Sequence, residues 1–376
     1  MNPVKVLIIV VAVVLVHGVI ISTCVPSCGK TPGKTDPKDE IVQGGGGVEA
    51  PVTPGEGGKG GADAPQKPQV ADSPKPKQPA DTRPATPGPG AQGAYYKGFF
   101  KVAERPLPAK LNSAVSEARS GLVIDLNTNT ILWQKNADKS YPIASLTKLL
   151  TSVMLMEHLE ATPGGSLKTK VTVTSSDRAY FKRNSINGVY LDTNESYSLD
   201  EYLMCMIVGS ANDCAYVVGR YLAGGDGDAF PAMMNRRAKE LGLAGMNFNN
   251  ANGLPIKNGS TRRENTGSAL EVAYLALRAM KYPEIMKWAK TTHGRIRADK
   301  KNPFDVNSTN KLLRGRVNGV NGLKTGFTDG AGYCIVVTCE RDGRKRMVLL
   351  MGVGGSDRGK RRDEIARLLL EWSYES

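Results

Sequence analysis

The chain has 376 residues, of which 40% are hydrophobic, and this is enough apolar material for a large folded core. The formal net charge is +14, and residues 25–94 hold eight Lys or Arg and eight Asp or Glu, so the basic excess belongs mainly to the part that follows. The three histidines, His17, His158 and His293, have no metal-ligand partner at useful spacing. This excludes a histidine-based metal centre, and we expect no cofactor.

The N-terminal segment predicts export. After Lys5, the run from Val6 to Val16 is uninterrupted apolar sequence, and it resumes through Ile21. Its length lies between a signal-peptide core and a membrane span, so residues 1–24 are predicted to be a signal or membrane anchor. Cleavage, lipidation at Cys24 and retention as a span all stay open. An exported protein meets anionic lipids and wall polymers rather than nucleic acid, and we expect the basic charge to attract those polymers.

A linker is predicted for residues 25–108. Between 25 and 94, 27 of the 70 residues are Pro or Gly. Such a segment cannot bury enough apolar surface to fold. We therefore expect a disordered tether in front of one folded domain, residues 109–376.

The first candidate functional residue of that domain is Ser145. Apolar residues recur at helical spacing from 146 to 156 and predict a helix of about four turns packed against a core. Ser145 and Lys148 are three apart on that helix, so their side chains share a face. Two other Ser-x-x-Lys pairs have no apolar periodicity behind them: Ser27/Lys30 and Ser308/Lys311. Ser145 is thus the better candidate nucleophile, with Lys148 as its candidate base.

A second pair of polar residues follows a predicted helix. Ser198 and Glu201 form a capping-box pattern that opens this helix, and we expect it to end at Gly209. Ser210 and Asn212 then fall in a short turn before the next helix, where both side chains can project into a cleft. The alternative is that they only cap the second helix.

The third element is a strand that carries Lys324, Thr325 and Gly326. Residues 320–324, 332–338 and 347–351 are β-rich runs, and Asp342-Gly343 between the last two is a hairpin signal. Gly326 allows another backbone to approach the strand closely, and a peptide could add along this edge as an extra strand. The alternative is a surface lysine in a glycine-rich turn.

These motifs, in this order, resemble the serine-type D-alanyl-D-alanine carboxypeptidases, which are low-molecular-mass penicillin-binding proteins. The similarity covers residues from roughly 109 to 372 and rests on the stretches 142–148, 209–215, 252–254, 322–329 and 331–333. It implies an α/β fold of the α+β type, related to the β-lactamases, with an antiparallel sheet of about five strands, flanking helices and an all-helical subdomain. Residues 109–376 would then be the catalytic domain.

The resemblance also implies a mechanism. Ser145 would attack the carbonyl between the terminal D-alanines of a peptidoglycan stem peptide while a neutral Lys148 takes its proton. Ser210 and Asn212 would relay protons and hold the substrate amide. The residues implied in substrate binding are Lys324, Thr325, Gly326, Phe327 through its backbone, and one arginine of the run 358–362, for which alignment of the last helix points to Arg362. β-Lactams would acylate the same serine as inhibitors.

Some alternatives stay open. The same site would cut crosslinks as a D,D-endopeptidase if the cleft admits a longer chain, or the protein would bind the wall with little activity. Many members of this family continue into a β-rich domain and a C-terminal amphipathic helix, and neither pattern follows residue 372, so we expect membrane contact through the N-terminus only. Cys205 and Cys214 are either a disulfide or free thiols, whereas Cys334 and Cys339 should face opposite sides of one strand.

Overall fold

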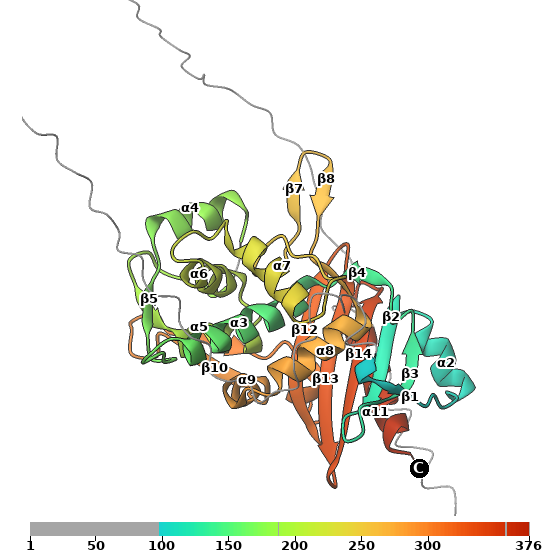
Figure 1. Cartoon of the computed structure of the whole chain (residues 1–376). Helices are drawn as coiled ribbons and strands as arrows, with labels where there is room; N and C mark the ends of the chain where they lie inside the picture. Colours follow the sequence, from blue (N-terminus) through green and yellow to red (C-terminus); the bar gives the residue numbers. More distant parts are fainter. Residues whose placement is uncertain (1–97, 187, 358, 376) are drawn as a thin grey trace, which may run out of the picture. The chain divides into compact units, whose positions relative to one another are not determined.

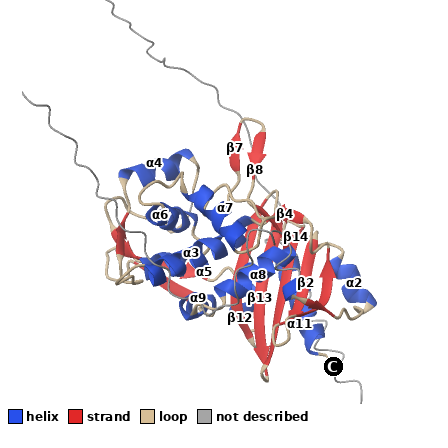
Figure 2. Ribbon diagram, in the orientation of Figure 1, coloured by secondary structure: helices blue, strands red, loops and turns tan. Residues whose placement is uncertain are grey.

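The structure is a computed structural model that describes residues 98–186, 188–357 and 359–375. All of them fall in one compact unit of the chain, Asp72–Ser376. The predicted N-terminal segment and residues 25–97 of the predicted linker lie outside the described residues. Residues 98–108, also predicted as linker, instead contain the strand β1 and the buried Phe100, so the folded part begins before residue 109. The fold class predicted from the sequence is confirmed: a mainly antiparallel sheet is combined with helices (Figures 1 and 2).

The central sheet has the strand order β1-β3-β2-β14-β13-β12. Five of these strands pair antiparallel, as expected, and the two-residue β1 adds a parallel edge to β3. Their bounds are β1 Lys101–Val102, β2 Ser120–Asp125, β3 Thr130–Lys135, β12 Val320–Thr328, β13 Gly332–Arg341 and β14 Arg344–Val353. The turn between β13 and β14 uses Asp342 and Gly343, both with positive φ, as the hairpin signal predicted.

The sheet is covered on both faces. On one face α2 and α11 bury a cluster that includes Val337, Val348 and Ile365. On the other face α8 packs against β2 and β14, and alternate strand residues such as Leu122 and Leu349 join the main core. This alternation is the period of two expected for strands whose faces are both buried.

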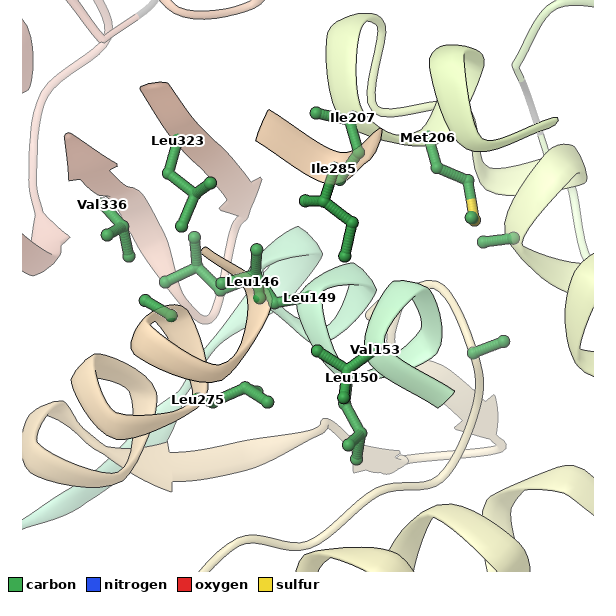
Figure 3. Close-up of a cluster of buried hydrophobic side chains, with 14 of the residues drawn as sticks. Leu146, Leu149, Leu150, Val153, Met206, Ile207, Leu275, Ile285, Leu323 and Val336 are labelled. Atoms are coloured by element: carbon green, nitrogen blue, oxygen red, sulfur yellow. The ribbon is translucent and has the colours of Figure 1, made fainter. Parts of the chain in front are cut away.

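A helical subdomain adjoins the sheet. Helix α3 packs on α5, α6 and α8, while α4 and α7 pack on α6. The helices are α2 Ala109–Val115, α3 Lys148–Ala161, α4 Ser175–Arg183, α5 Leu199–Val208, α6 Asn212–Leu222, α7 Phe230–Glu240, α8 Ala269–Ala279, α9 Pro283–Ala289, α10 Lys311–Arg314 and α11 Lys360–Tyr374. Figure 3 shows Leu149, Leu150 and Val153 of α3 in one apolar cluster with Leu275 of α8, Ile207 of α5, and Leu323 and Val336 of the sheet. The buried helix α3 therefore ties the subdomain to the sheet.

Four two-stranded pairs complete the described part. They are β4 Ser140–Pro142 with β9 Thr266–Ser268, β5 Lys170–Thr172 with β6 Ser196–Ser198, β7 Ile256–Asn258 with β8 Thr261–Arg263, and β10 His293–Ile296 with β11 Phe304–Asn307. The pair β7–β8 projects beyond the body of the fold (Figure 1).

Candidate active site

Ser145 lies in a tight turn in front of α3. The sequence placed it on the helix itself, but residues Ala144–Thr147 form a 3₁₀ turn, η2, and α3 begins at Lys148. Ala144 has a φ of +47°, an unusual conformation for a residue with a side chain. A Cβ at Gly253 would lie 1.9 Å from the Ala144 carbonyl oxygen, so only glycine fits against this turn. The turn is thus held by close backbone packing.

Lys148 is fully buried beneath Ser145. Its Nζ donates to Ser145 Oγ at 2.9 Å, Asn212 Oδ1 at 2.8 Å and the Asn252 carbonyl at 2.7 Å. Burial lowers the pKa of Lys148 well below its usual value, the charge of Lys324 lowers this pKa further, and Asp213 opposes the change. The structure therefore holds a lysine whose neutral form is favoured next to the candidate nucleophile.

Ser210 and Asn212 come from the turn between α5 and α6. Helix α5 has the predicted capping box of Ser198 and Glu201 and ends before Gly209. The N-cap of α6 is Ala211, and no side chain forms a capping hydrogen bond there. The alternative that Ser210 and Asn212 only cap this helix is therefore wrong. Ser210 has a φ of +59° and its Oγ accepts from Lys324 Nζ at 2.8 Å. The two side chains thus reach the two buried lysines.

The strand β12 forms the opposite wall. Lys324 is almost completely buried, and its Nζ also donates to the Thr325 carbonyl at 2.8 Å. Burial, followed by the charge of Arg362, lowers the pKa of Lys324 to about 7. Thr325 Oγ1 donates to Thr309 Oγ1 at 2.6 Å. The surface-turn alternative fails, because Lys324 points into the fold.

Gly326 brings this strand against the nucleophile turn. A Cβ at this position would lie 3.0 Å from the backbone nitrogen of Ser145 and 3.2 Å from Ala144 Cβ. The close approach predicted from the sequence is present, and the backbone of Phe327 follows directly.

Of the two arginines of its run that the structure describes, Arg362 is the one that lines the site. It is 4% exposed, pairs with Asp363 and donates to the Cys334 carbonyl at 3.2 Å. Arg361 instead pairs with Glu117 and Glu364. Arg358 lies outside the described residues.

These residues share one cleft of about 310 Å³. Lys148 and Lys324 lie beneath it, and the lining residues are Ser145, Ser210, Asn212, Leu254, Thr309, Lys311, Thr325, Gly326, Phe327, Tyr333 and Arg362. A cleft of this size suits a small ligand or one segment of a peptide. Every predicted site residue is therefore at the cleft or in direct contact with a side chain that lines it.

Sequence reasoning missed four lining residues. Leu254 and Tyr333 stand inside stretches that carried the family resemblance but were given no role. Thr309 and Lys311 belong to the segment 308–311, whose Ser308/Lys311 pair was dismissed as a nucleophile motif. Only tertiary contact with β12 brings this segment to the cleft. The Ser308/Lys311 pair therefore marked residues of the cleft wall rather than a second nucleophile.

Asp213 is a further missed residue, next to Asn212 in sequence. Its buried carboxylate accepts from the backbone N–H groups of Val189, Leu191 and Cys214. A Cβ at Gly188 would lie 1.8 Å from Asp213 Oδ1. Asp213 therefore fastens the segment 188–191 to the start of α6, beside the cleft.

Other chemistry has little support in the described part of the chain. It contains no group of three or more His, Cys, Asp or Glu that could hold a metal ion. The cysteines Cys205, Cys214, Cys334 and Cys339 are buried free thiols there, and Cys334 and Cys339 belong to cores on opposite sheet faces, as expected. Across residues 98–186, 188–357 and 359–375, no helix has the length and apolar character needed to cross a membrane.

Comparison with known proteins identifies relatives of this chain. The family model described as D-alanyl-D-alanine carboxypeptidase, peptidase S11, matches residues 108–354. D-alanyl-D-alanine carboxypeptidase DacF of Bacillus subtilis is 29% identical over 63% of this chain and 57% of its own length. A D-alanyl-D-alanine endopeptidase of Pseudomonas aeruginosa is 28% identical over 58% of this chain and 66% of its own length. The chain thus spans less than two thirds of these curated relatives.

A solved structure is also similar. The crystal structure of penicillin-binding protein D2 from Listeria monocytogenes, in its ampicillin-bound form, matches with a TM-score of 0.58 and 29% identity. The match covers 69% of this chain and 98% of that chain.

Proposed function

The chain belongs to the D-alanyl-D-alanine carboxypeptidase family, and from this premise we propose that it is an exported serine D,D-carboxypeptidase. It removes the terminal D-alanine from peptidoglycan stem peptides through an acyl-enzyme on Ser145, and β-lactams acylate the same serine. The observation that carries the proposal is the contact of the buried Lys148 with Ser145 Oγ.

The hydrogen bonds of Lys148 support its role as base. Asn212 Oδ1 and the Asn252 carbonyl are acceptors only, so they take the two N–H bonds of a neutral amine. The lone pair is then left for the hydroxyl proton of Ser145. Ser145 Oγ attacks the carbonyl carbon as this proton moves to Lys148 Nζ.

The later steps use the other side of the cleft. The backbone N–H groups of Ser145 and Phe327 stabilise the oxyanion of the tetrahedral intermediate. Ser210 gives its hydroxyl proton to the leaving amine and takes a replacement from Lys324, whose Nζ donates to it at 2.8 Å. Thr325 and Arg362 bind the carboxylate of the leaving D-alanine. Water then attacks the acyl-enzyme and its proton passes through Ser210 to Lys324, while Lys148 returns its proton to Ser145 Oγ. The stem peptide leaves with one residue fewer.

A fluorescent penicillin tests the nucleophile. Wild type should be labelled covalently and Ser145→Ala should not. Ser152→Ala is the matched control, because Ser152 lies in α3 about two turns beyond Ser145 and is fully buried. This variant should still be labelled. Failure of wild type to label would contradict the enzyme proposal and favour a wall-binding protein.

D,D-endopeptidase activity is the second candidate, supported by the similarity to the endopeptidase of Pseudomonas aeruginosa. Mass analysis of muropeptides after incubation separates the two activities. Loss of one terminal D-alanine indicates the carboxypeptidase, and conversion of crosslinked dimers to monomers indicates the endopeptidase.

A further inference from the structure

An aromatic pair on the wall of the cleft has no role in the mechanism above. Phe327 and Tyr333 are paired residues of β12 and β13, and their rings stack with centroids 4.3 Å apart and an interplanar angle of 27°. The mechanism uses only the backbone N–H of Phe327. Yet Phe327 is 47% exposed and lines the cleft, so a large apolar side chain is accessible to a ligand there.

The pair is held rigidly. A Cβ built on Gly359 would lie 3.0 Å from Tyr333 Cδ1 and 3.4 Å from Arg362 Cζ, so the Tyr333 ring is packed against the turn that precedes α11. Phe327 rests on this fixed ring. A preformed aromatic surface of this kind loses little conformational entropy when it binds an apolar group.

A third apolar side chain lines the same cleft. Leu254 follows Gly253, and two asparagines fix its backbone: its N–H donates to Asn252 Oδ1 at 2.9 Å, and its carbonyl accepts from Asn250 Nδ2 at 2.6 Å. The cleft therefore combines a polar part around the lysines and Arg362 with an apolar part.

The direction of the strand indicates which half of the ligand meets the rings. Thr325 and Phe327 are two apart on β12, so their side chains project from the same face of the sheet. If Thr325 and Arg362 bind the leaving carboxylate and Phe327 N–H binds the scissile carbonyl, the acyl half continues along β12 past Phe327.

We propose that Phe327 and Tyr333 form an aromatic platform that binds the apolar side chain of the acyl half of the ligand and so determines specificity. The platform rests on the proposed function, since it orients the ligand relative to Ser145. It favours acyl donors with an aliphatic or aryl side chain over donors that lack one.

The test compares two penicillins that share the reactive ring. Benzylpenicillin carries an aryl acyl side chain, and 6-aminopenicillanic acid carries none. For Phe327→Ala we expect the second-order acylation rate constant to fall roughly tenfold more with benzylpenicillin than with 6-aminopenicillanic acid. Because the Phe327 ring is half exposed, its removal opens no cavity in the core.

Tyr190→Ala is the matched control. Its side chain is 62% exposed, it is aromatic, and it is not among the residues that line the cleft. This variant should leave the ratio of the two rate constants unchanged. An equal loss with both penicillins, or no loss with benzylpenicillin, in a Phe327→Ala protein with wild-type thermal stability would overturn the proposal. Failure of wild type to react with either penicillin would instead overturn the proposed function.

Discussion

Two lysines with buried ammonium groups give the site its chemistry. Lys148 contacts the nucleophile and Lys324 contacts Ser210. The charge of Lys324 disfavours a charge on Lys148, and the charge of Arg362 disfavours a charge on Lys324. Burial is the larger cause of the lowered pKa in both residues. The fold thus holds Lys148 as a base at a pH where an exposed lysine would be charged, and this arrangement reduces stability at neutral pH.

Lys324→Met should reveal that loss of stability. In the folded protein the pKa of Lys324 is about 7, and in the unfolded chain the lysine keeps its ordinary value of 10.5. Between these values the unfolded state binds more protons, so the free energy of unfolding rises with pH and falls as pH drops towards 7. The variant should lack this contribution, of about 1 kcal/mol per pH unit.

Urea unfolding of both proteins at several pH values between 8 and 9.5 measures the difference. With a pKa of about 7, Lys324 is mostly neutral in this pH range, so its replacement hardly changes the charge that acts on Lys148. The contributions of the other titrating groups then cancel in the comparison. Identical slopes for wild type and variant would show that Lys324 keeps its ordinary pKa in the fold.

At the level of elements, the site depends on how closely β12 approaches η2. The nitrogen of Ser145 lies in η2 and that of Phe327 in β12, and Gly326 is the point of contact between the two segments. Both N–H groups must point to one oxyanion, so the spacing of the two segments determines how well they act together.

Gly326→Ala should therefore impair acylation without unfolding the protein. The new Cβ would lie 3.0 Å from the Ser145 nitrogen and 3.2 Å from the Ile143 carbonyl oxygen, and these backbone atoms cannot move away as a flexible side chain can. We expect acylation by a penicillin to slow by roughly 100-fold, the loss typical of one missing oxyanion donor. Gly354→Ala is the control, since a Cβ there has no atom within 4 Å. Wild-type acylation by Gly326→Ala would show that this contact does not control the site.

Local sequence signals predicted some of these elements well. The capping box at Ser198, the end of α5 and the turn at Asp342-Gly343 follow from side chains that act within a few residues, and the structure confirms all three. The 3₁₀ turn at Ser145 could not be read from periodicity, because packing against Gly253, more than 100 residues away, holds it. Thr309 was missed for the same reason, since its partner Thr325 lies on another element.

At the scale of the molecule, the cleft forms where the helical subdomain meets the sheet. Asn212 belongs to the helical part, Thr325 to β12, and Ser145 to the turn that joins β4 to α3. No single segment contains the site, so local sequence patterns could not predict that these residues lie together. The family resemblance could, because it links the separate motifs to one site. The sequence also predicts an exported protein, with residues 1–24 as signal or anchor.

Deletion of residues 1–94 tests whether the N-terminus holds the protein at the membrane. The apolar run from Val6 to Ile21 should anchor the full chain, so penicillin-labelled protein should sediment with membranes, and the deleted form should appear in the soluble fraction. The basic charge offers a second route to membranes, by attraction to anionic lipids, which salt screens. Each fraction is therefore washed at high ionic strength before labelling. A deletion of residues 44–61 alone, which keeps the apolar run, serves as control and should remain in the pellet. If the form without residues 1–94 still sediments after the salt wash, the anchor lies elsewhere in the chain.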